Sequence, residues 1–312
     1  MILSNLHFKR SVSVLIGYLA SPHVGLSAAA LFWSGNFIVG RALRDAISPL
    51  SLNFWRWLIA LAILLPFTHG SLWVHRQVIL REWKLITAIG LTGIAAFHTC
   101  VYLALVTTSA VNALLLLAMT PLLIVLGSWL VFQDRITLQQ LLGIGVSLVG
   151  AIALIAQGSM SVFMALRFSA GDLWMLLAVV LWAIYSLLLK RRPVELPQTA
   201  LLSASTVAAI LLMSPLYSWG LFSEQQSLPS TQVVWGLLYV SLFASVLAFL
   251  LWNNGVSRIG PSRAGTFLYL MPVFGAVLSV AFLGEGVQLF QLVGGTLVFS
   301  GIAVMNWKRS GQ

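Results

Sequence analysis

Cysteine is almost absent from this sequence, which contains only Cys100. A single thiol cannot form an intramolecular disulfide, and it cannot supply a multi-thiolate metal site or an iron–sulfur cluster. We interpret Cys100 as a small packing residue.

Charged side chains are also scarce. They make up 8% of the 312 residues, and only seven residues are acidic, whereas soluble domains contain roughly 25% charged residues. Hydrophobic residues account for 60% of the chain, and its mean hydropathy is +0.99. Because a soluble fold cannot cover this much apolar surface, the composition predicts a membrane protein.

The residue groups that carry enzyme chemistry are missing as well. The sequence has no Gly-rich phosphate loop, no cluster of metal ligands, and no Ser/His/carboxylate set on one side of the membrane. It therefore predicts a protein that is not an enzyme and has no cofactor or metal.

Long apolar runs dominate what is present. A helix needs roughly 20 apolar residues to cross a bilayer, and about ten such runs cover almost the whole chain. They predict an all-α membrane protein with ten transmembrane helices. The expected spans are residues 24–43, 50–68, 84–106, 110–132, 137–157, 172–190, 198–219, 232–256, 262–283 and 288–307.

The basic residues indicate the orientation. The net charge of +10 is spread over loops and not gathered into one patch, which argues against nucleic-acid binding. Thirteen Lys and Arg lie on the side of the two termini, and three, Arg41, Arg44 and Arg167, lie on the other. By the positive-inside rule, both termini are expected in the cytoplasm.

Residues 1–23 resemble a signal peptide, because Lys9 and Arg10 precede a short apolar run. Cleavage there would place the new N-terminus outside, against the charge bias. We therefore interpret 1–23 as a cytoplasmic tail or an interfacial segment.

The chain contains an internal repeat. Sliding the sequence along itself by 149 positions in the early part of each half, and by 151 later, aligns many identical residues. The aligned pairs include Trp33 with Trp182, Pro121 with Pro272, and Gly143 with Gly294. The sequence therefore divides into a first repeat, 24–157, and a second, 172–307.

Five spans per repeat is an odd number, so the second repeat is expected to enter the membrane upside down relative to the first. Inverted repeats underlie alternating access in many transporters, with the substrate site at their seam. Each repeat ends in a pair of spans around an acidic turn, at Asp134 and Glu285. At these membrane boundaries we expect a structural or capping role for the carboxylates, with ion coupling as the alternative.

Four motifs follow one another in a characteristic order along the two repeats. They are Phe32-Trp33-Ser34-Gly35-Asn36-Phe37, Phe54-Trp55-Arg56, Ala110-Val111-Asn112-Ala113 with Pro121, and Gly260-Pro261-Ser262-Arg263-Ala264 with Pro272. Together these motifs resemble the EamA family of the drug/metabolite transporter superfamily. The resemblance implies ten helices and a central cavity formed mainly by spans 1, 3, 4, 6, 8 and 9. It also implies export of metabolites or amino acids from the bacterial cytoplasm across the inner membrane.

Polar residues at bilayer depth are the first candidates for substrate binding. In the first span Trp33, Asn36 and Phe37 share one helical face. The alternative for Asn36 is a hydrogen bond to a neighbouring helix. Trp182 and Tyr185 are candidates in the sixth span, where Tyr185 aligns with Asn36, although packing or lipid contact would also explain these aromatics.

Two basic residues need separate treatment. His98, one turn before Tyr102, is a candidate for proton coupling, and a neutral imidazole hydrogen-bonded between helices is the alternative. Arg56 could attract a substrate carboxylate at the external mouth. A snorkelling side chain or a partner for Asp45 is the competing interpretation.

The remaining substrate-binding candidates are Tyr102, Asn112, Asn253 and Tyr269. Tyr102 aligns with Asn253 in the repeat. Asn112 and Asn253 lie near helix ends, where satisfaction of backbone groups is an alternative role.

Two further features concern the scaffold. Pro121 and Pro272 each remove a helical hydrogen bond, so we expect a kink at both. Gly143, Ser147 and Ala151 form a ridge of small residues for close helix packing, either within one chain or between chains, which leaves a homodimer open.

The sequence predicts a secondary transporter that exports small metabolites, most readily amino acids, in contact with the lipid bilayer. Two alternatives remain. A flippase for lipid-linked intermediates or a nucleotide-sugar carrier needs more basic groups in the core than Arg56 alone, and a non-transporting membrane subunit needs no paired polar and aromatic residues.

Overall fold

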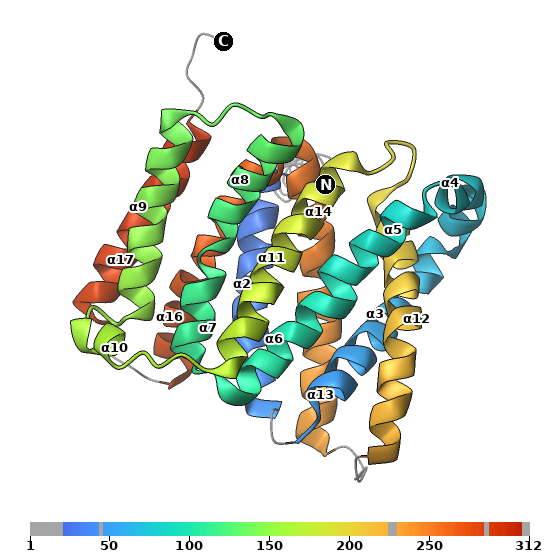
Figure 1. Cartoon of the computed structure of the whole chain (residues 1–312), viewed down its shortest axis with the longest axis horizontal. Coiled ribbons are helices and arrows are strands. Elements are labelled where there is room, and N and C mark those ends of the chain that lie inside the picture. The colour runs from blue at the N-terminus through green and yellow to red at the C-terminus, as the bar shows by residue number, and fades with distance from the viewer. Residues whose placement is uncertain (1–20, 44–45, 224–229, 284–286, 308–312) are drawn as a thin grey trace, which may run out of the picture.

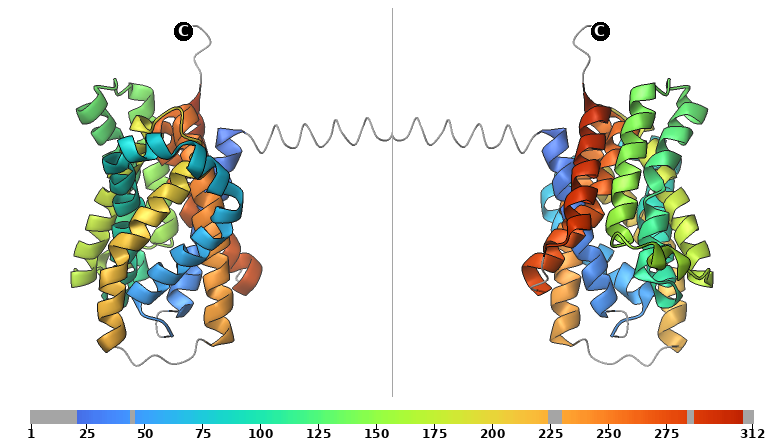
Figure 2. Two further views of the ribbon diagram at one scale, coloured as in Figure 1. Left: turned by 90° about the vertical axis from the view of Figure 1, so that its right-hand side faces the viewer. Right: turned by 90° about the vertical axis from the view of Figure 1, so that its left-hand side faces the viewer.

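The computed structural model describes residues 21–43, 46–223, 230–283 and 287–307. Within those ranges the chain is helical and contains no strand. The helices run roughly along one common axis, and the start of α2 and the end of α17 lie at the same end of the bundle (Figures 1 and 2). The expectations for residues 1–20, for Asp45 and for the turn at Glu285 lie outside the described residues.

The first half of the chain forms α2 to α10. The elements are α2 (Pro22–Leu43), α3 (Pro49–Val74), α4 (Arg76–Arg81), α5 (Trp83–Gly90), the π-helix η1 (Leu91–Ala95), α6 (Ala96–Thr107), α7 (Ala110–Leu117), α8 (Thr120–Phe132), α9 (Leu138–Ile155) and α10 (Met160–Met164).

The second half forms α11 to α17. Its elements are α11 (Ala170–Leu188), the 3₁₀-helix η2 (Leu189–Arg191), α12 (Gln198–Ser223), α13 (Thr231–Tyr239), the π-helix η3 (Val240–Leu247), α14 (Ala248–Ile259), α15 (Pro261–Gly265), the 3₁₀-helix η4 (Thr266–Tyr269), α16 (Leu270–Leu283) and α17 (Leu289–Asn306).

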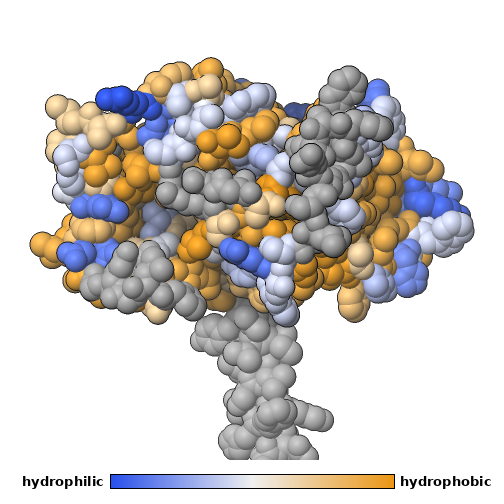
Figure 3. Space-filling view, turned by 90° about the horizontal axis from the view of Figure 1, so that it is seen from below, coloured by the Kyte–Doolittle hydropathy of each residue, from blue (hydrophilic) through white to orange (hydrophobic). Residues whose placement is uncertain are grey.

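Eight helical runs of the described chain are long and apolar enough to cross a membrane. They correspond to eight of the ten expected spans. The other two ranges, 24–43 and 262–283, are also helical, but α2 is less apolar and the later range is divided among α15, η4 and α16. The protein is thus an all-helical membrane protein. Many large apolar side chains are exposed on its outer surface, and hydrophilic residues lie among hydrophobic ones at the end of the bundle seen in Figure 3.

Local sequence signals explain where several helices begin. The Ser48 hydroxyl accepts a hydrogen bond from the Ser51 amide, and Pro49 follows at the first helical position of α3. Thr137 and Gln140 form a capping box at the start of α9. Asp134 forms an ion pair with Lys190 at 2.6 Å, a contact of the kind expected for a structural role at this turn.

The repeat offset reappears in the helix boundaries. α12 begins and ends 149 positions after α3, and α17 begins and ends 151 positions after α9. Both long helices α3 and α12 contain an internal proline at the same offset, Pro66 and Pro215. The π-helix η1 likewise aligns with a stretch inside η3. The two halves therefore share regular helices and also the same irregularities.

The two other aligned prolines follow interruptions of the α-helix. A turn at residues 118–119 separates α7 from α8, which has Pro121 at its second position. The 3₁₀-helix η4 ends three residues before Pro272. The missing proline amide allows the break, because the preceding carbonyls lose an intrahelical donor.

α9 and α17 pack with their backbones in direct contact (Figure 1). A Cβ on Gly143 would lie 2.7 Å from the Gly301 carbonyl oxygen, and a Cβ on Gly150 would lie 2.6 Å from that of Gly294. The Ser147 hydroxyl donates to the Val298 carbonyl at 3.3 Å. The small-residue ridge predicted from the sequence is therefore used within the chain.

We expect Gly143→Leu to lower the thermal unfolding midpoint of the purified protein in detergent. The added side chain has no space between α9 and α17, and overpacking of this kind costs about 1–3 kcal/mol. The measurement is a comparison of unfolding midpoints in one detergent.

Gly145→Leu is the matched control, because Gly145 is exposed on the same helix and nothing lies within 4 Å of a Cβ built there. Equal midpoints for the two variants would show that α9 and α17 do not pack as described.

Candidate functional site

Two tryptophans from aligned positions of the two halves meet at the centre of the bundle. Trp33 on α2 and Trp182 on α11 are in edge-to-face contact, with ring centroids 5.0 Å apart. Phe249 and Trp252 on α14 contact both indoles. The Trp33 indole donates to the Ala244 carbonyl of η3 at 3.0 Å, so the π-helix fixes one member of this aromatic cluster.

A cavity of about 30 Å³ lies against this aromatic cluster. That volume holds about two water molecules, which is too little for a metabolite. Its walls come from α2, α6, α7, α11, η4 and α16, which belong to the expected spans 1, 3, 4, 6 and 9. The lining residues are Trp33, Asn36, Phe37, Phe97, His98, Val101, Leu117, Trp182, Leu268 and Met271.

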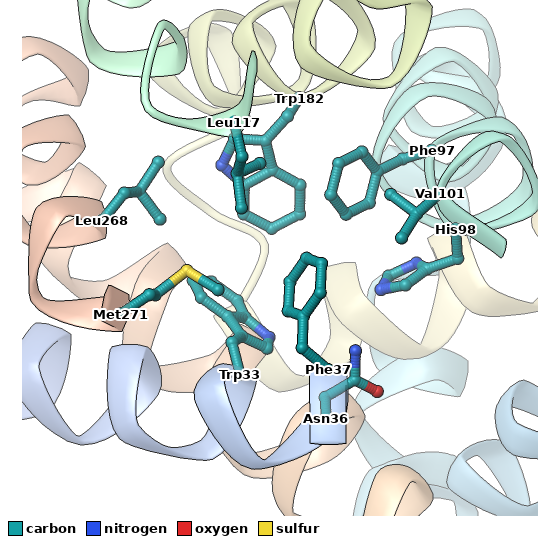
Figure 4. A pocket seen from close by; sticks show the side chains of 10 residues that line it. All are labelled: Trp33, Asn36, Phe37, Phe97, His98, Val101, Leu117, Trp182, Leu268 and Met271. Carbon is teal, nitrogen blue, oxygen red and sulfur yellow. The ribbon is translucent and has the colours of Figure 1, made fainter. Parts of the chain in front are cut away.

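This central cavity has a polar and an apolar end. Asn36 and His98 lie close together at one end, and Leu268 and Met271 lie at the other, with the aromatic rings between them (Figure 4). In a conformation with a wider cavity, such a lining would suit a small molecule with one polar group and an apolar remainder.

A second cavity of about 400 Å³ adjoins the first, and Phe37 and Met271 line both. It lies between the C-terminal parts of α2 and α9 and the N-terminal parts of α7 and α17, toward the end of the bundle seen in Figure 3. Its volume falls in the range of about 300–1,000 Å³ typical of ligand pockets.

Arg56 on α3 is buried directly behind the polar end of the central cavity. Its side chain is 0% exposed, so it does not snorkel to the membrane surface, and that interpretation of the sequence was wrong. Nη1 donates to the Tyr102 hydroxyl at 2.7 Å and to Asn36 Oδ1 at 3.3 Å, and Nε donates to the Ser245 hydroxyl at 2.9 Å. Nη2 has no hydrogen-bond partner among the described residues.

None of the four acidic side chains of the described residues contacts Arg56. Glu82 pairs with Arg81 and Asp134 pairs with Lys190. Asp172 accepts from Thr108, Asn112 and Ser169, and Glu195 is exposed in a loop. Within the described part of the chain, the oxygens that hold the guanidinium are thus all neutral.

The same pair of residue types forms a hydrogen bond in each half. The Tyr102 hydroxyl lies 3.5 Å from Asn36 Oδ1, and the Tyr185 hydroxyl donates to Asn253 Oδ1 at 2.6 Å. Asn36 aligns with Tyr185 and Tyr102 aligns with Asn253, so the two residue types exchange helices between the halves. The repeat alignment had matched these positions between the halves, but it did not predict that Asn36 contacts Tyr102 and that Tyr185 contacts Asn253.

His98 is buried in the wall of the central cavity. Its Nδ1 lies 3.4 Å from the Ile94 carbonyl oxygen, and its ring contacts Trp57, Phe97, Phe249 and, more distantly, Tyr102. Described carboxylates do not contact it. Both the coupling role and the structural role remain compatible with this position.

Asn112 and Tyr269 lie away from the central cavity. Asn112 Nδ2 donates to both oxygens of Asp172 at 3.3 Å and to the Arg167 carbonyl at 3.0 Å, which ties the start of α7 to the start of α11. Tyr269 is 1% exposed and its hydroxyl has no partner. Neither residue lines the central cavity, and Asn112 lines a separate pocket together with Arg167 and Asp172.

The structure therefore brings together Trp33, Asn36, Phe37, His98 and Trp182 around one cavity, with Tyr102 one layer behind. Tyr185 and Asn253 lie beside the aromatic cluster and do not line the cavity. The sequence analysis did not identify Ser245 or the lining residues Phe97, Val101, Leu117, Leu268 and Met271. Ser245 aligns with an apolar residue of the first half at either repeat offset, so the repeat gave no signal for it.

Comparison with known families identifies the chain. Residues 21–156 and 169–307 each match the EamA-like transporter family. The chain belongs to this family. The resemblance seen in the sequence motifs is confirmed, and the protein is a multi-pass membrane transporter with a small-molecule substrate.

Three relatives of this EamA-like transporter have names that describe transport or export. The Bacillus subtilis protein named uncharacterized transporter YyaM is 30% identical over 90% of this chain and 92% of its own length. A probable terminal-alkyne amino-acid exporter of Streptantibioticus cattleyicolor is 26% identical, covering 90% and 91%. A probable amino-acid metabolite efflux pump of Salmonella typhimurium is also 26% identical, covering 87% and 90%.

A solved crystal structure has the same fold as the EamA-like chain. The TM-score is 0.74, with 21% identity, over 92% of this chain and 96% of the other. The long, broken helices described above therefore belong to a known arrangement.

We expect Tyr185→Phe to destabilise the transporter by roughly 1 kcal/mol or more. The substitution leaves the buried Oδ1 of Asn253 without its donor, and an unsatisfied buried acceptor is costly. The check is the shift of the thermal unfolding midpoint in detergent.

Tyr269→Phe serves as the control, since it removes an equally buried hydroxyl that has no partner, and it should leave the midpoint unchanged or raise it. A loss of stability no larger for Tyr185→Phe than for Tyr269→Phe would contradict the hydrogen bond to Asn253.

Proposed function

We propose that this EamA-like transporter exports small metabolites, above all amino acids or related compounds, across the bacterial inner membrane by alternating access. The observation that carries the proposal is the central cavity at the contact of Trp33 with Trp182. A cavity at the seam of two repeats is where an alternating-access carrier binds its substrate.

Inverted repeats and ten membrane crossings form the structural part of the proposal. Ser147 bonds to Val298, its own aligned position 151 residues later, and Trp33 touches Trp182 in the same way. Two aligned residues touch each other only near an axis that relates the two halves. These contacts support a pseudo-two-fold axis between repeats at 24–157 and 172–307.

The orientation proposed is the one that the basic loops predict, with both termini in the cytoplasm. The 400 Å³ cavity then lies in the external half of the transporter. The Tyr185–Asn253 hydrogen bond lies in the cytoplasmic half, where it would help to close that side. Breaking and forming these repeat-related bonds in turn would open the two sides alternately.

We expect a reporter that is active only in the cytoplasm to be active when fused after the C-terminus. The same reporter inserted after Gly158, in the loop between α9 and α10, should be inactive. The opposite result at either position would overturn the orientation.

Amino acids and related metabolites are favoured as cargo for two reasons. Two relatives are named as a probable amino-acid exporter and a probable amino-acid metabolite efflux pump. The cavity itself offers a polar end and a long aromatic and aliphatic wall. A phosphate-rich substrate, as in a nucleotide-sugar carrier or a lipid-linked flippase, would need several cations, and Arg56 is the one basic residue besides His98 near this cavity in the described chain.

Counterflow in proteoliposomes tests the function. Vesicles preloaded with mixed amino acids should take up a defined subset of labelled ones, and Trp33→Ala, Asn36→Ala and Trp182→Ala should each reduce that exchange about tenfold or more. His98→Gln should keep exchange and lose its response to an imposed pH gradient if His98 couples proton movement.

Asn112→Ala is the control, because Asn112 bonds to Asp172 away from the cavity, and it should exchange like wild type. Normal exchange by all three cavity variants would refute the site, and an unchanged pH response of His98→Gln would refute its coupling role. Silence of well-folded wild type toward every amino acid would favour a lipid-type substrate or a non-transport role.

A further inference from the structure

We propose that Arg56 is the residue that binds the carboxylate group of the substrate and thereby selects carboxylates over their neutral or amine analogues. This inference rests on the proposed transport function and adds the substrate class and the residue that recognises it.

The position of Arg56 is unusual for a cation in a membrane span. It lies on α3, one of the eight candidate spans, and is fully buried. Nε donates a hydrogen bond to the Ser245 hydroxyl of the π-helix η3, and Nη1 donates to Asn36 and Tyr102. α2, α3, α6 and η3 therefore converge on one guanidinium, whose carbon also lies 5.6 Å from the centre of the Trp57 ring.

A buried guanidinium with no anion is energetically costly. Arginine stays protonated in proteins, and burying its charge is unfavourable unless a counter-charge and further hydrogen bonds compensate. Its partners among the described residues are neutral. The countercharge best able to stabilise it in the working transporter is one that arrives with the substrate.

The hydrogen bonds leave one nitrogen available for that charge. Nη2 is buried without a partner, and Nη1 is adjacent to it on the same face of the guanidinium fork. A carboxylate binds such a pair of nitrogens through two parallel, charge-assisted hydrogen bonds. Asn36 Oδ1, held at a long 3.3 Å from Nη1, is the weakest partner and the one that a carboxylate oxygen would replace.

Asn36 also connects Arg56 with the cavity. It lines the polar end of the central cavity beside His98 (Figure 4), and it contacts Arg56 on its other side. A substrate that enters from the larger cavity past Phe37 and Met271 would place its carboxylate toward Asn36 and Arg56. Its apolar part would then lie along the aromatic wall, toward Leu268.

The repeat limits the number of such sites to one. The position that aligns with Arg56 in the second half is Ser205, which is buried and donates to the Leu202 carbonyl. A single guanidinium matches a single carboxylate. It does not match a diphosphate or a dicarboxylate that would need a second cation at equal depth.

The test is counterflow with matched pairs of probes, L-phenylalanine with L-phenylalaninamide and L-leucine with L-leucinamide, in proteoliposomes of wild type, Arg56→Lys and Arg56→Gln. Wild type should exchange at least one acid with a KM about tenfold or more below that of its amide. Arg56→Gln should lose this preference, and Arg56→Lys, which keeps the charge but not the fork, should keep the preference with a raised KM.

Arg167→Gln is the control for loss of one positive charge, because Arg167 lies exposed in the loop before α11, and it should exchange like wild type. If Arg56→Gln does not fold, the acid-over-amide preference of wild type and of Arg56→Lys decides the question. If the guanidinium only holds helices together, replacing Arg56 would lower stability and leave the ratio of the KM values for acid and amide unchanged.

Wild type that exchanges acids and amides equally, or Arg56→Gln that keeps the preference, would overturn the role of Arg56 while leaving transport in place. Wild type that exchanges neither member of any pair, although well folded, would overturn the amino-acid function and this inference with it.

Discussion

The bilayer supplies no hydrogen bonds, and this constraint shapes every polar feature of the transporter. Each polar group within a span must find its partner inside the protein. The π-helix η1 frees the Ile94 and Ala95 carbonyls, and Asn53 Nδ2 contacts both. In η3 the Ala244 carbonyl accepts from Trp33. The irregular turns of the helices are thus satisfied by side chains of neighbouring helices, and those side chains are thereby fixed around the central cavity.

Several buried polar atoms of the described residues have no hydrogen-bond partner, and Arg56 Nη2 is the only one of them that belongs to a charged side chain. The two halves share helix boundaries, internal prolines, π-helices and an Asn–Tyr hydrogen bond, yet among the described residues only the first half contains a buried arginine or lysine, where the second has Ser205. A symmetric scaffold is suited to opening on either side in turn. The polar end of the cavity is formed by Asn36 and His98, and under the proposed function the single charge behind it would make substrate recognition asymmetric.

The sequence predicted the scaffold well and the site in part. Apolar run length is a local property, so the ten expected ranges fall on helical segments, although α3 continues six residues beyond residue 68, α12 four beyond residue 219 and α14 three beyond residue 256. Trp33, Asn36, Phe37, His98 and Trp182 line the cavity as predicted from helical faces. Asn112 does not, because Asp172 at the start of the next repeat binds its amide, and a pairing across 60 residues leaves no local signal.

The sequence by itself determined that the chain is a membrane protein built from two repeats, because hydropathy and internal identity need no third dimension, and its motifs carried the resemblance to a transporter family. Only the tertiary structure decided where the Arg56 side chain lies. From sequence, an arginine two turns into a span can extend to the surface. Its burial depends on which faces of α2, α6 and η3 meet α3, and those contacts join residues up to 189 positions apart. Long-range packing sets the environment of a charge, whereas sequence fixes only its place along the helix.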